Sequence, residues 1–164
     1  MSAQVATGRG TYAETVALPA GIVAPAPVSV PLTAAAGLPP AGLTAWQALD
    51  ALALPEGATL LVTGAVGSVG GLAVQLARLR GLTVVAHVRT AGDIERARAL
   101  GAARVVVGED ASGLPSGAVD ALPETAGLPR AVAAVRDGGR VVSVLLSGVP
   151  VTEHSISGRP FPRA

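Results

Sequence analysis

Apolar runs alternate with amphipathic segments along the second half of the chain. Residues 58–63 form an apolar run of strand length, and residues 82–88 form another. Such runs are typical of parallel strands that are buried on both faces. Between them, residues 68–80 place apolar side chains at helical spacing. This alternation predicts βαβ units and a doubly wound, Rossmann-like parallel α/β sheet.

The same pattern continues to residue 146 and brings the expected sheet to about five strands. The further expected elements are strands over 104–107, 119–122 and 140–146, a helix over 92–100 capped by Asp93, and a helix over 129–136. The fourth strand is weaker than the others, and Pro123 lies inside its end, where a proline removes a ladder hydrogen bond. No segment of helix length separates residues 107 and 119.

The N-terminal third has a different pattern. Residues 8–16 predict a short strand, and residues 18–31 are a Pro-rich connector. Two helices are expected over residues 32–54, interrupted at Pro39 and Pro40, with Trp46 on the buried side of the second. The predicted organisation is an N-terminal segment over 1–54, a Rossmann-like domain over 55–147 and a loop tail over 148–164.

Composition narrows the chemistry that this chain can perform. It contains no cysteine and no lysine, and its 12 positive charges are all arginine against 11 acids, a net charge of +1. Disulfides, thiolate metal sites, a cysteine nucleophile and a lysine Schiff base are therefore excluded. With two histidines, no metal site of three ligands at sensible spacing can be drawn. Near-zero net charge without a basic run argues against a nucleic-acid partner.

The uncharged stretch over residues 16–49 is long enough to span a bilayer, but prolines interrupt it repeatedly. No basic region followed by an apolar one opens the chain, so no signal peptide is expected. These features predict a cytoplasmic protein that does not bind a membrane.

A glycine motif carries the chemistry. Gly64, Gly67 and Gly70 lie where the run over 58–63 turns into the helix over 68–80. In such a turn the first glycine allows the bend, the second lets backbone approach a pyrophosphate and the third lets the helix pack against the strand. The helix N-terminus then offers N–H groups and partial positive charge to phosphate. The alternative is that these glycines serve packing alone, with no nucleotide bound.

The residues of this turn carry a resemblance to a known family. Residues 64–70 (GAVGSVG) followed by 73–77 (AVQLA) resemble the nucleotide turn of the zinc-free quinone oxidoreductases, in the medium-chain dehydrogenase/reductase superfamily. That superfamily includes the enoyl reductase domains of polyketide synthases. Residues 10–14 (GTYAE), 41–49 (AGLTAWQAL) and 99–102 (ALGA) resemble flanking family segments in the same order. The resemblance implies a nucleotide-binding domain without most of the family's catalytic barrel.

The end of the second strand predicts which nucleotide binds. An acid there would select NAD by bonding the ribose 2′-hydroxyl, but this chain has Arg89, with His87 nearby. A guanidinium suits the 2′-phosphate of NADP. An ordinary exposed charge at Arg89 and a buried strand residue at His87 are the alternatives. The full set of expected cofactor contacts is Thr44, Gly64, Gly67, Ser68, Val69, Gly70, His87, Arg89, Thr125 and Ser143.

Three functions remain open. The first is an NADPH-binding oxidoreductase that acts on a hydrophobic quinone- or enone-like small molecule, with Tyr12, Glu153 and His154 as candidate proton donors or acceptors. The second is a non-redox cyclase or isomerase of polyketide-like metabolism that uses an emptied nucleotide groove. The third is a non-catalytic module that pairs with a partner, and a homodimer is one way to cover the apolar face that the missing barrel would leave.

Overall fold

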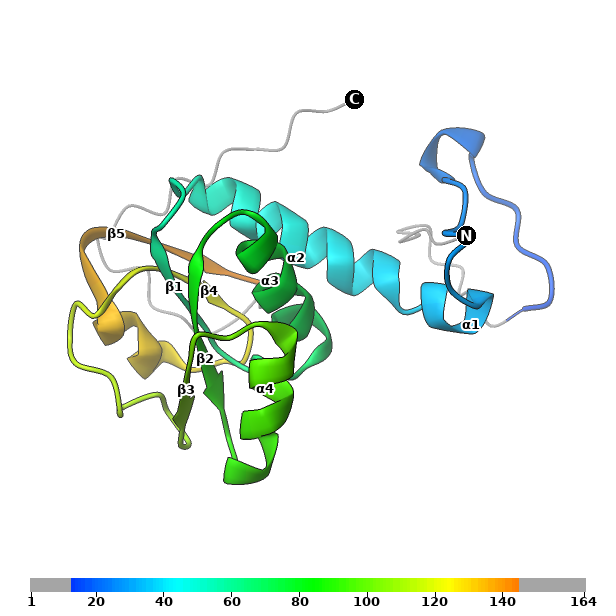
Figure 1. Ribbon diagram of the computed structural model, residues 1–164. Coiled ribbons are helices and arrows are strands. Elements are labelled where there is room, and N and C mark those ends of the chain that lie inside the picture. Colours follow the sequence, from blue (N-terminus) through cyan, green and yellow to red (C-terminus); the bar gives the residue numbers. More distant parts are fainter. Residues whose placement is uncertain (1–12, 145–164) are drawn as a thin grey trace. The chain divides into compact units, whose positions relative to one another are not determined.

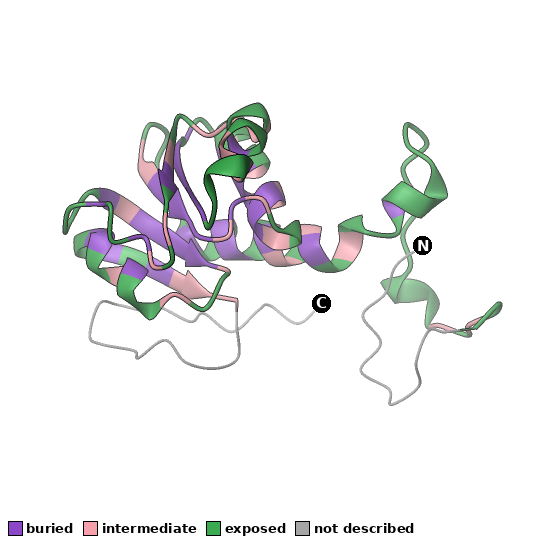
Figure 2. Cartoon of the chain, turned by 90° about the horizontal axis from the view of Figure 1, so that it is seen from below, coloured by how far each residue is buried: buried purple, intermediate pink, exposed green. Residues whose placement is uncertain are grey.

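The computed structural model describes residues 13–144, which belong to two compact units, 1–43 and 44–164. The described part of the first unit contains a short 3-10 helix, η1 (Ala20–Ile22), and one turn of helix, α1 (Leu32–Ala35). Most of its residues are exposed (Figure 2). Of the strand expected over 8–16, only residues 13–16 are described, and they form no strand.

The second unit is built on a five-stranded parallel sheet (Figure 1). The strands are β1 (Thr59–Val62), β2 (Thr83–Val88), β3 (Arg104–Val107), β4 (Val119–Glu124) and β5 (Val135–Ser143). Their order is β3-β2-β1-β4-β5, and every neighbouring pair is parallel. The predicted Rossmann-like α/β fold is therefore confirmed. The order reverses between β1 and β4, which is where open α/β sheets bind ligands.

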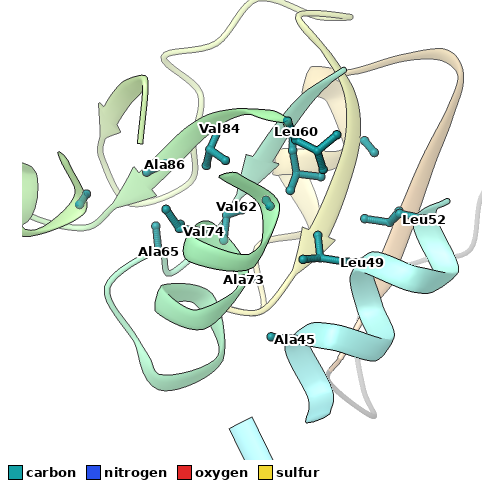
Figure 3. Close-up of a cluster of buried hydrophobic side chains, with 14 of the residues drawn as sticks. Ala45, Leu49, Leu52, Leu60, Val62, Ala65, Ala73, Val74, Val84 and Ala86 are labelled. Carbon is teal, nitrogen blue, oxygen red and sulfur yellow. The ribbon is translucent and has the colours of Figure 1, made fainter. Parts of the chain in front are cut away.

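Helices cover the first face of the sheet. They are α3 (Ser68–Leu79), α4 (Ile94–Leu100), which follows the 3-10 helix η2 (Ala91–Asp93), and α2 (Leu38–Leu52), whose residues from Thr44 onward lie in this unit. Figure 3 shows Leu49 and Leu52 of α2 and Val74 of α3 gathered around Leu60 and Val62 of β1. All five side chains are buried. This cluster forms the main apolar core.

The second face carries a thinner layer. It consists of the loop over residues 108–118 and the six-residue 3-10 helix η3 (Pro129–Ala134). Leu114 from the loop and Ala131 from η3 pack with Leu61 and Leu122 of the sheet. As the sequence predicts, no helix forms between β3 and β4.

Three local expectations are wrong. Pro39 and Pro40 do not interrupt a helix pair, because they lie in the first turn of α2. The N–H groups of a first turn have no partner within the helix, so a proline there removes no hydrogen bond. Trp46 is 50% exposed, and the guanidinium of Arg80 lies 4.5 Å from the centre of its ring. Asp93 is the N-cap residue of α4, as predicted, although its side chain makes no cap bond and instead accepts a hydrogen bond from Thr90 (3.0 Å).

The third difference concerns the last helix and strand. The expected helix over 129–136 is a 3-10 helix that ends at Ala134, and β5 begins directly at Val135. Pro123 lies within the end of β4, as predicted, where it is buried and opposite Val142 of β5. Within residues 13–144, no helix has the length and apolar character that crossing a bilayer requires.

Candidate functional site

A tight turn joins β1 to α3. Gly64 has a φ of 58°, in the left-handed region that favours glycine. The N–H of Gly67 donates to the carbonyl of Gly64 at 2.9 Å and closes the turn. Gly70 follows in the first turn of α3, where an added Cβ would collide with the Gly64 carbonyl, 2.8 Å from its carbon. Gly64 thus permits the bend, and Gly70 lets the helix sit directly on it.

The N-terminus of α3 opens from this turn. Gly67 precedes the helix without a side-chain cap bond, and the N–H of Gly71 donates to the carbonyl of Gly67 at 2.8 Å. The preceding N–H groups, of Ser68, Val69 and Gly70, have no carbonyl partner inside the helix. Gly67 and Ser68 are exposed. The turn therefore presents donors and the positive end of the helix dipole to an incoming anion.

The end of β2 lies beside the turn, since the N–H of Ala65 donates to the carbonyl of His87 (3.0 Å). The His87 side chain is 3% exposed, with its Nε2 2.8 Å from the carbonyl oxygen of Gly108. Its Nδ1 is buried and has no partner among the described residues. Arg89, two residues on, is exposed and forms no hydrogen bond or ion pair within residues 13–144. No acid occupies this strand end.

On the other side of β1, three side chains hold the ends of β1 and β4 together. Thr63 Oγ1 donates to Glu124 Oε1 (3.1 Å) and accepts from the N–H of Thr125 (2.9 Å). Thr125 Oγ1 donates to the carbonyl of Thr63 (2.5 Å). Glu124 Oε1 also accepts the N–H groups of Ala126 (2.8 Å) and Leu128 (3.1 Å). We call Thr63, Glu124 and Thr125 the switch-point cluster, because they lie where the strand order reverses.

The parallel register brings His87, Thr63 and Glu124 into one row across the sheet. Val62 pairs with Ala86 and Leu60 with Ala121, so each register continued along the strands places Thr63 level with His87 and with Glu124. Alternation along the strands puts all three side chains on the second face. All three are buried. The carboxyl edge of the sheet thus carries a buried polar row beside the point where the strand order reverses.

The predicted cofactor residues lie in four places. The five residues of the glycine turn lie together, and an added Cβ at Gly64 would contact the Thr125 hydroxyl at 3.4 Å. His87 and Arg89 lie at the end of β2, and Ser143 pairs with Glu124 across β4 and β5. Thr44 lies on α2, half-buried.

The three candidate proton-transfer residues, Tyr12, Glu153 and His154, lie outside the described residues. The motifs of the sequence assigned Thr63 and Glu124 no role in the site. The one feature of the sequence that could identify them is their position. Thr63 directly follows β1 and Glu124 ends β4, the two strands between which the strand order reverses. Their mutual contact joins residues 61 apart in the chain.

A separate cavity of about 370 Å³ lies on the second face, between the loop before β4 and η3. Leu114 and Ala134 contribute apolar surface, and Arg130 pairs with Asp110 at 3.3 Å. Hydrogen bonds from Ser112, followed by the Arg130 guanidinium, hold the pKa of Asp110 below its ordinary value. No residue of the glycine turn lines this cavity. Among the described residues, no three acids or histidines gather in a way that could hold a metal ion.

No protein-family model matches the chain. A curated relative, the 2-methylene-furan-3-one reductase of Solanum lycopersicum, is 34% identical over 137 residues, covering 81% of this chain and 35% of the relative. The quinone oxidoreductase of Thermus thermophilus, solved alone and with NADPH, is 31% identical with a TM-score of 0.73, over 82% of this chain and 46% of that one. The CurK enoyl reductase is 26% identical with a TM-score of 0.64, over 74% of this chain and 40% of that one.

The chain spans about a third of the length of the curated relatives that it matches. The match to the Thermus enzyme covers 82% of the present chain, so the glycine turn and the sheet around it have the architecture of a reductase nucleotide-binding domain.

Proposed function

Because the chain is related to the quinone oxidoreductase and enoyl reductase branch of the medium-chain dehydrogenase/reductase superfamily, we propose that it binds NADP(H) at the glycine turn. We further propose that it acts in the reduction of a hydrophobic quinone- or enone-like small molecule. The reductases that it resembles are named for substrates of this kind or solved with NADPH. The chain spans about a third of the length of the curated relatives, so the complete reaction is part of this proposal.

The site supports this cofactor at two points. The open N–H groups at Ser68 and Val69 are placed to donate to the pyrophosphate. Gly67 is exposed at the start of α3 and carries no side chain, so a phosphate could approach the backbone there. When bound, the nicotinamide supplies a hydride to the substrate. This chain's described residues bind and orient it.

The single observation that carries the choice of NADP is Arg89. Its guanidinium is exposed and unpaired within residues 13–144, at the strand end where an acid would select NAD. His87 is buried against Gly108, so Arg89 is the residue that we propose for the 2′-phosphate.

The first test is titration of the protein with NADPH and NADH, followed by nicotinamide fluorescence. We expect NADPH to bind in the micromolar range and Arg89→Ala to weaken it about 10- to 100-fold, the value of a charge-assisted hydrogen bond. NADH binding should change little. Arg98→Ala, which removes an exposed arginine on α4, is the matched charge control. No binding at millimolar NADPH would sink the proposal.

The glycine turn gives a second test. Gly67→Asp places a negative charge where we expect the pyrophosphate, yet aspartate is a favourable residue at a helix N-cap. The variant should therefore keep its unfolding temperature and lose cofactor binding. Gly67→Ser supplies a neutral cap and should bind at least tenfold better than the aspartate variant. Activity that survives Gly67→Asp would show that the cofactor is not used.

Proton transfer to the reduced substrate is proposed for Tyr12 or for the pair Glu153 and His154, which lie outside the described residues. Tyr12→Phe and His154→Gln separate the two. The responsible variant should lower kcat about 10²-fold or more while NADPH binding stays unchanged.

A second candidate function is a module completed by another chain. The observation that favours it is exposed apolar surface in the first unit, at Val28, Leu32 and Leu43. A homodimer would be the simplest form. Size-exclusion chromatography with light scattering tests it, and a monomer at high micromolar concentration would count against self-association.

A further inference from the structure

We propose that Thr63 and Glu124 are positioning residues: they fix the loop after β4 against the loop after β1 and so shape the nicotinamide side of the crevice. This inference rests on the proposed function, because it concerns the same cofactor. The role is separate from phosphate binding, which falls to the glycine turn and Arg89. Neither side chain needs to touch the cofactor to perform it.

The bonds of the switch-point cluster carry the inference. Thr63 Oγ1 both donates to Glu124 (3.1 Å) and accepts from the N–H of Thr125 (2.9 Å), so one hydroxyl joins two strand ends. Glu124 Oε1 then accepts the N–H groups of Ala126 and Leu128, which fold the chain back just after β4. The course of residues 125–128 is therefore set by one buried carboxylate.

Burying Glu124 at this position costs free energy. Its side chain is fully buried, and its Oε2 has no partner within residues 13–144. A buried polar atom without a partner costs free energy, and such costs concentrate at functional sites. Packing alone would be served better by an apolar side chain, as at Leu122 two residues earlier on the same face. What the carboxylate adds is the fixed position of the backbone that follows.

The location of the cluster decides which half of the cofactor it affects. With the pyrophosphate at the N-terminus of α3 and the adenosine ribose at the end of β2, the adenosine half lies over β1 and β2. The other half must then lie across β1 toward β4. There Thr125 and Ala126 stand against Gly64, at 3.4 and 3.2 Å from the site of an added Cβ. Displacing the 125–128 loop should therefore disturb the nicotinamide half and spare the adenosine half.

Two probes separate the halves: NADPH contains both, and adenosine 2′,5′-bisphosphate contains the adenosine half. Calorimetric titration of Thr63→Val, which removes the hydroxyl at nearly constant volume, should weaken NADPH about tenfold, the scale of a small misplacement. It should change the affinity for the bisphosphate less than about twofold. Thr63→Ser restores the hydroxyl and should bind both probes as the parent does. Arg89→Ala, in contrast to Thr63→Val, should weaken the binding of both NADPH and the bisphosphate.

A second measurement reads the cluster without any ligand. Hydrogen exchange of the peptide that contains the Ala126 and Leu128 amides should speed up at least tenfold in Thr63→Val, with exchange in α4 unchanged. Glu124→Gln keeps an acceptor for all three donors without the charge, so it should fold and give a smaller increase.

Equal weakening of both probes by Thr63→Val, or unchanged exchange at residues 126–128, would overturn the inference. A parent protein that binds the bisphosphate but not NADPH would overturn it too, while leaving phosphate recognition intact. A parent protein that binds neither probe would contradict the proposed function. The positioning role of the cluster would then be overturned as well, because there would be no cofactor to position.

Discussion

The two faces of the sheet are buried by very different amounts of chain. On the first face, α2, α3 and α4 cover β1 and β2 with a cluster in which Leu60 is fully buried. On the second face, Leu61, the next residue of the same strand, is equally buried under one loop and a six-residue 3-10 helix. Burial of the two leucines is the same, but helices cover one of them and a loop with a single short 3-10 helix covers the other.

That difference matters because the polar row lies on the thinner side. His87, Thr63 and Glu124 all face the layer formed by the 108–118 loop and η3. Hydrogen bonds with backbone partners, such as those from Ala126 and Leu128 to Glu124, replace helix packing there. The first face therefore provides stability, and the second provides directed polar groups.

The largest expected effect comes from shortening the two leucines. Leu60→Ala should lower the free energy of unfolding by about 4 kcal/mol, because helices around it cannot collapse into the space. Leu61→Ala should cost about 2–3 kcal/mol, since a loop can follow the lost volume. Urea denaturation measures both. Equal costs would show that the two layers are equally rigid.

A pair of neighbouring glycines in α3 gives the next largest effect. Gly70→Ala should cost about 1–3 kcal/mol by overpacking and should also abolish cofactor binding, because the new methyl meets the Gly64 carbonyl. In Gly71→Ala the methyl meets nothing nearer than Leu100 at 3.5 Å, and the helix gains roughly 0.5–1 kcal/mol from the lost glycine. Thermal unfolding with NADPH titration distinguishes them. If both variants have similar unfolding temperatures and similar affinities for NADPH, the backbone of the turn shifts easily to admit a methyl group at Gly70.

A smaller effect is expected where β5 meets the first-face helices. Arg140 donates to the carbonyls of Leu52 (2.8 Å) and Ala53 (3.4 Å), at the C-terminal end of α2, where a cation is favourable. Arg140→Ala should cost about 1 kcal/mol. Arg98→Ala, which breaks an exposed pair within α4, should cost less than about 0.5 kcal/mol in chemical denaturation. A cost for Arg140 no larger than that would make its contact with α2 incidental.

The smallest expected effect depends on pH and lies at the amino edge of the sheet. A hydrogen bond from Arg136 (2.6 Å), followed by one from the Thr59 N–H (2.8 Å), lowers the pKa of Asp120 from its ordinary value of 3.8. A carboxyl with a lowered pKa stabilises the fold above its ordinary value and loses that contribution as pH falls through the folded value. Asp120→Asn should therefore flatten the decline in unfolding temperature below about pH 4.

Glu109→Gln, which changes an exposed acid on the second-face loop, is the control for that measurement and should leave the acid decline unchanged. An Asp120→Asn variant with the parent's pH profile would contradict the assigned role of Asp120.

Sequence periodicity was sufficient for the first half of the sheet and insufficient for the second. Strands β1 to β3 and helix α3 lie within a residue or two of their predicted bounds, because apolar runs and glycine turns mark them directly. The start of β5 was missed, since Arg136, Asp137 and two glycines hide its strand character. The sequence predicts a buried Trp46 because aromatic residues are usually buried. Its ring instead packs against Arg80.

The residues of the candidate site also differ in how far the sequence predicts them. The glycine turn is local, so its residues follow from the motif. The bond between Thr63 and Glu124 crosses 61 residues, and a periodic pattern carries no information about which distant strands become neighbours. The roles assigned to Arg89, Thr44 and Ser143 stay predictions.

The strand order also has a consequence for how the chain folds. Strands β4 and β5 pair through partners such as Leu122 and Val141, which are 19 residues apart in the chain. The contacts between β1 and β4, such as Leu60 with Ala121 and Thr63 with Glu124, join residues that are 61 apart. Closing a longer loop costs more entropy and slows formation of the contact. The seam between β1 and β4 therefore forms after its two halves, β1 to β3 and β4 to β5. The crevice proposed for the cofactor is the last part of the sheet to close.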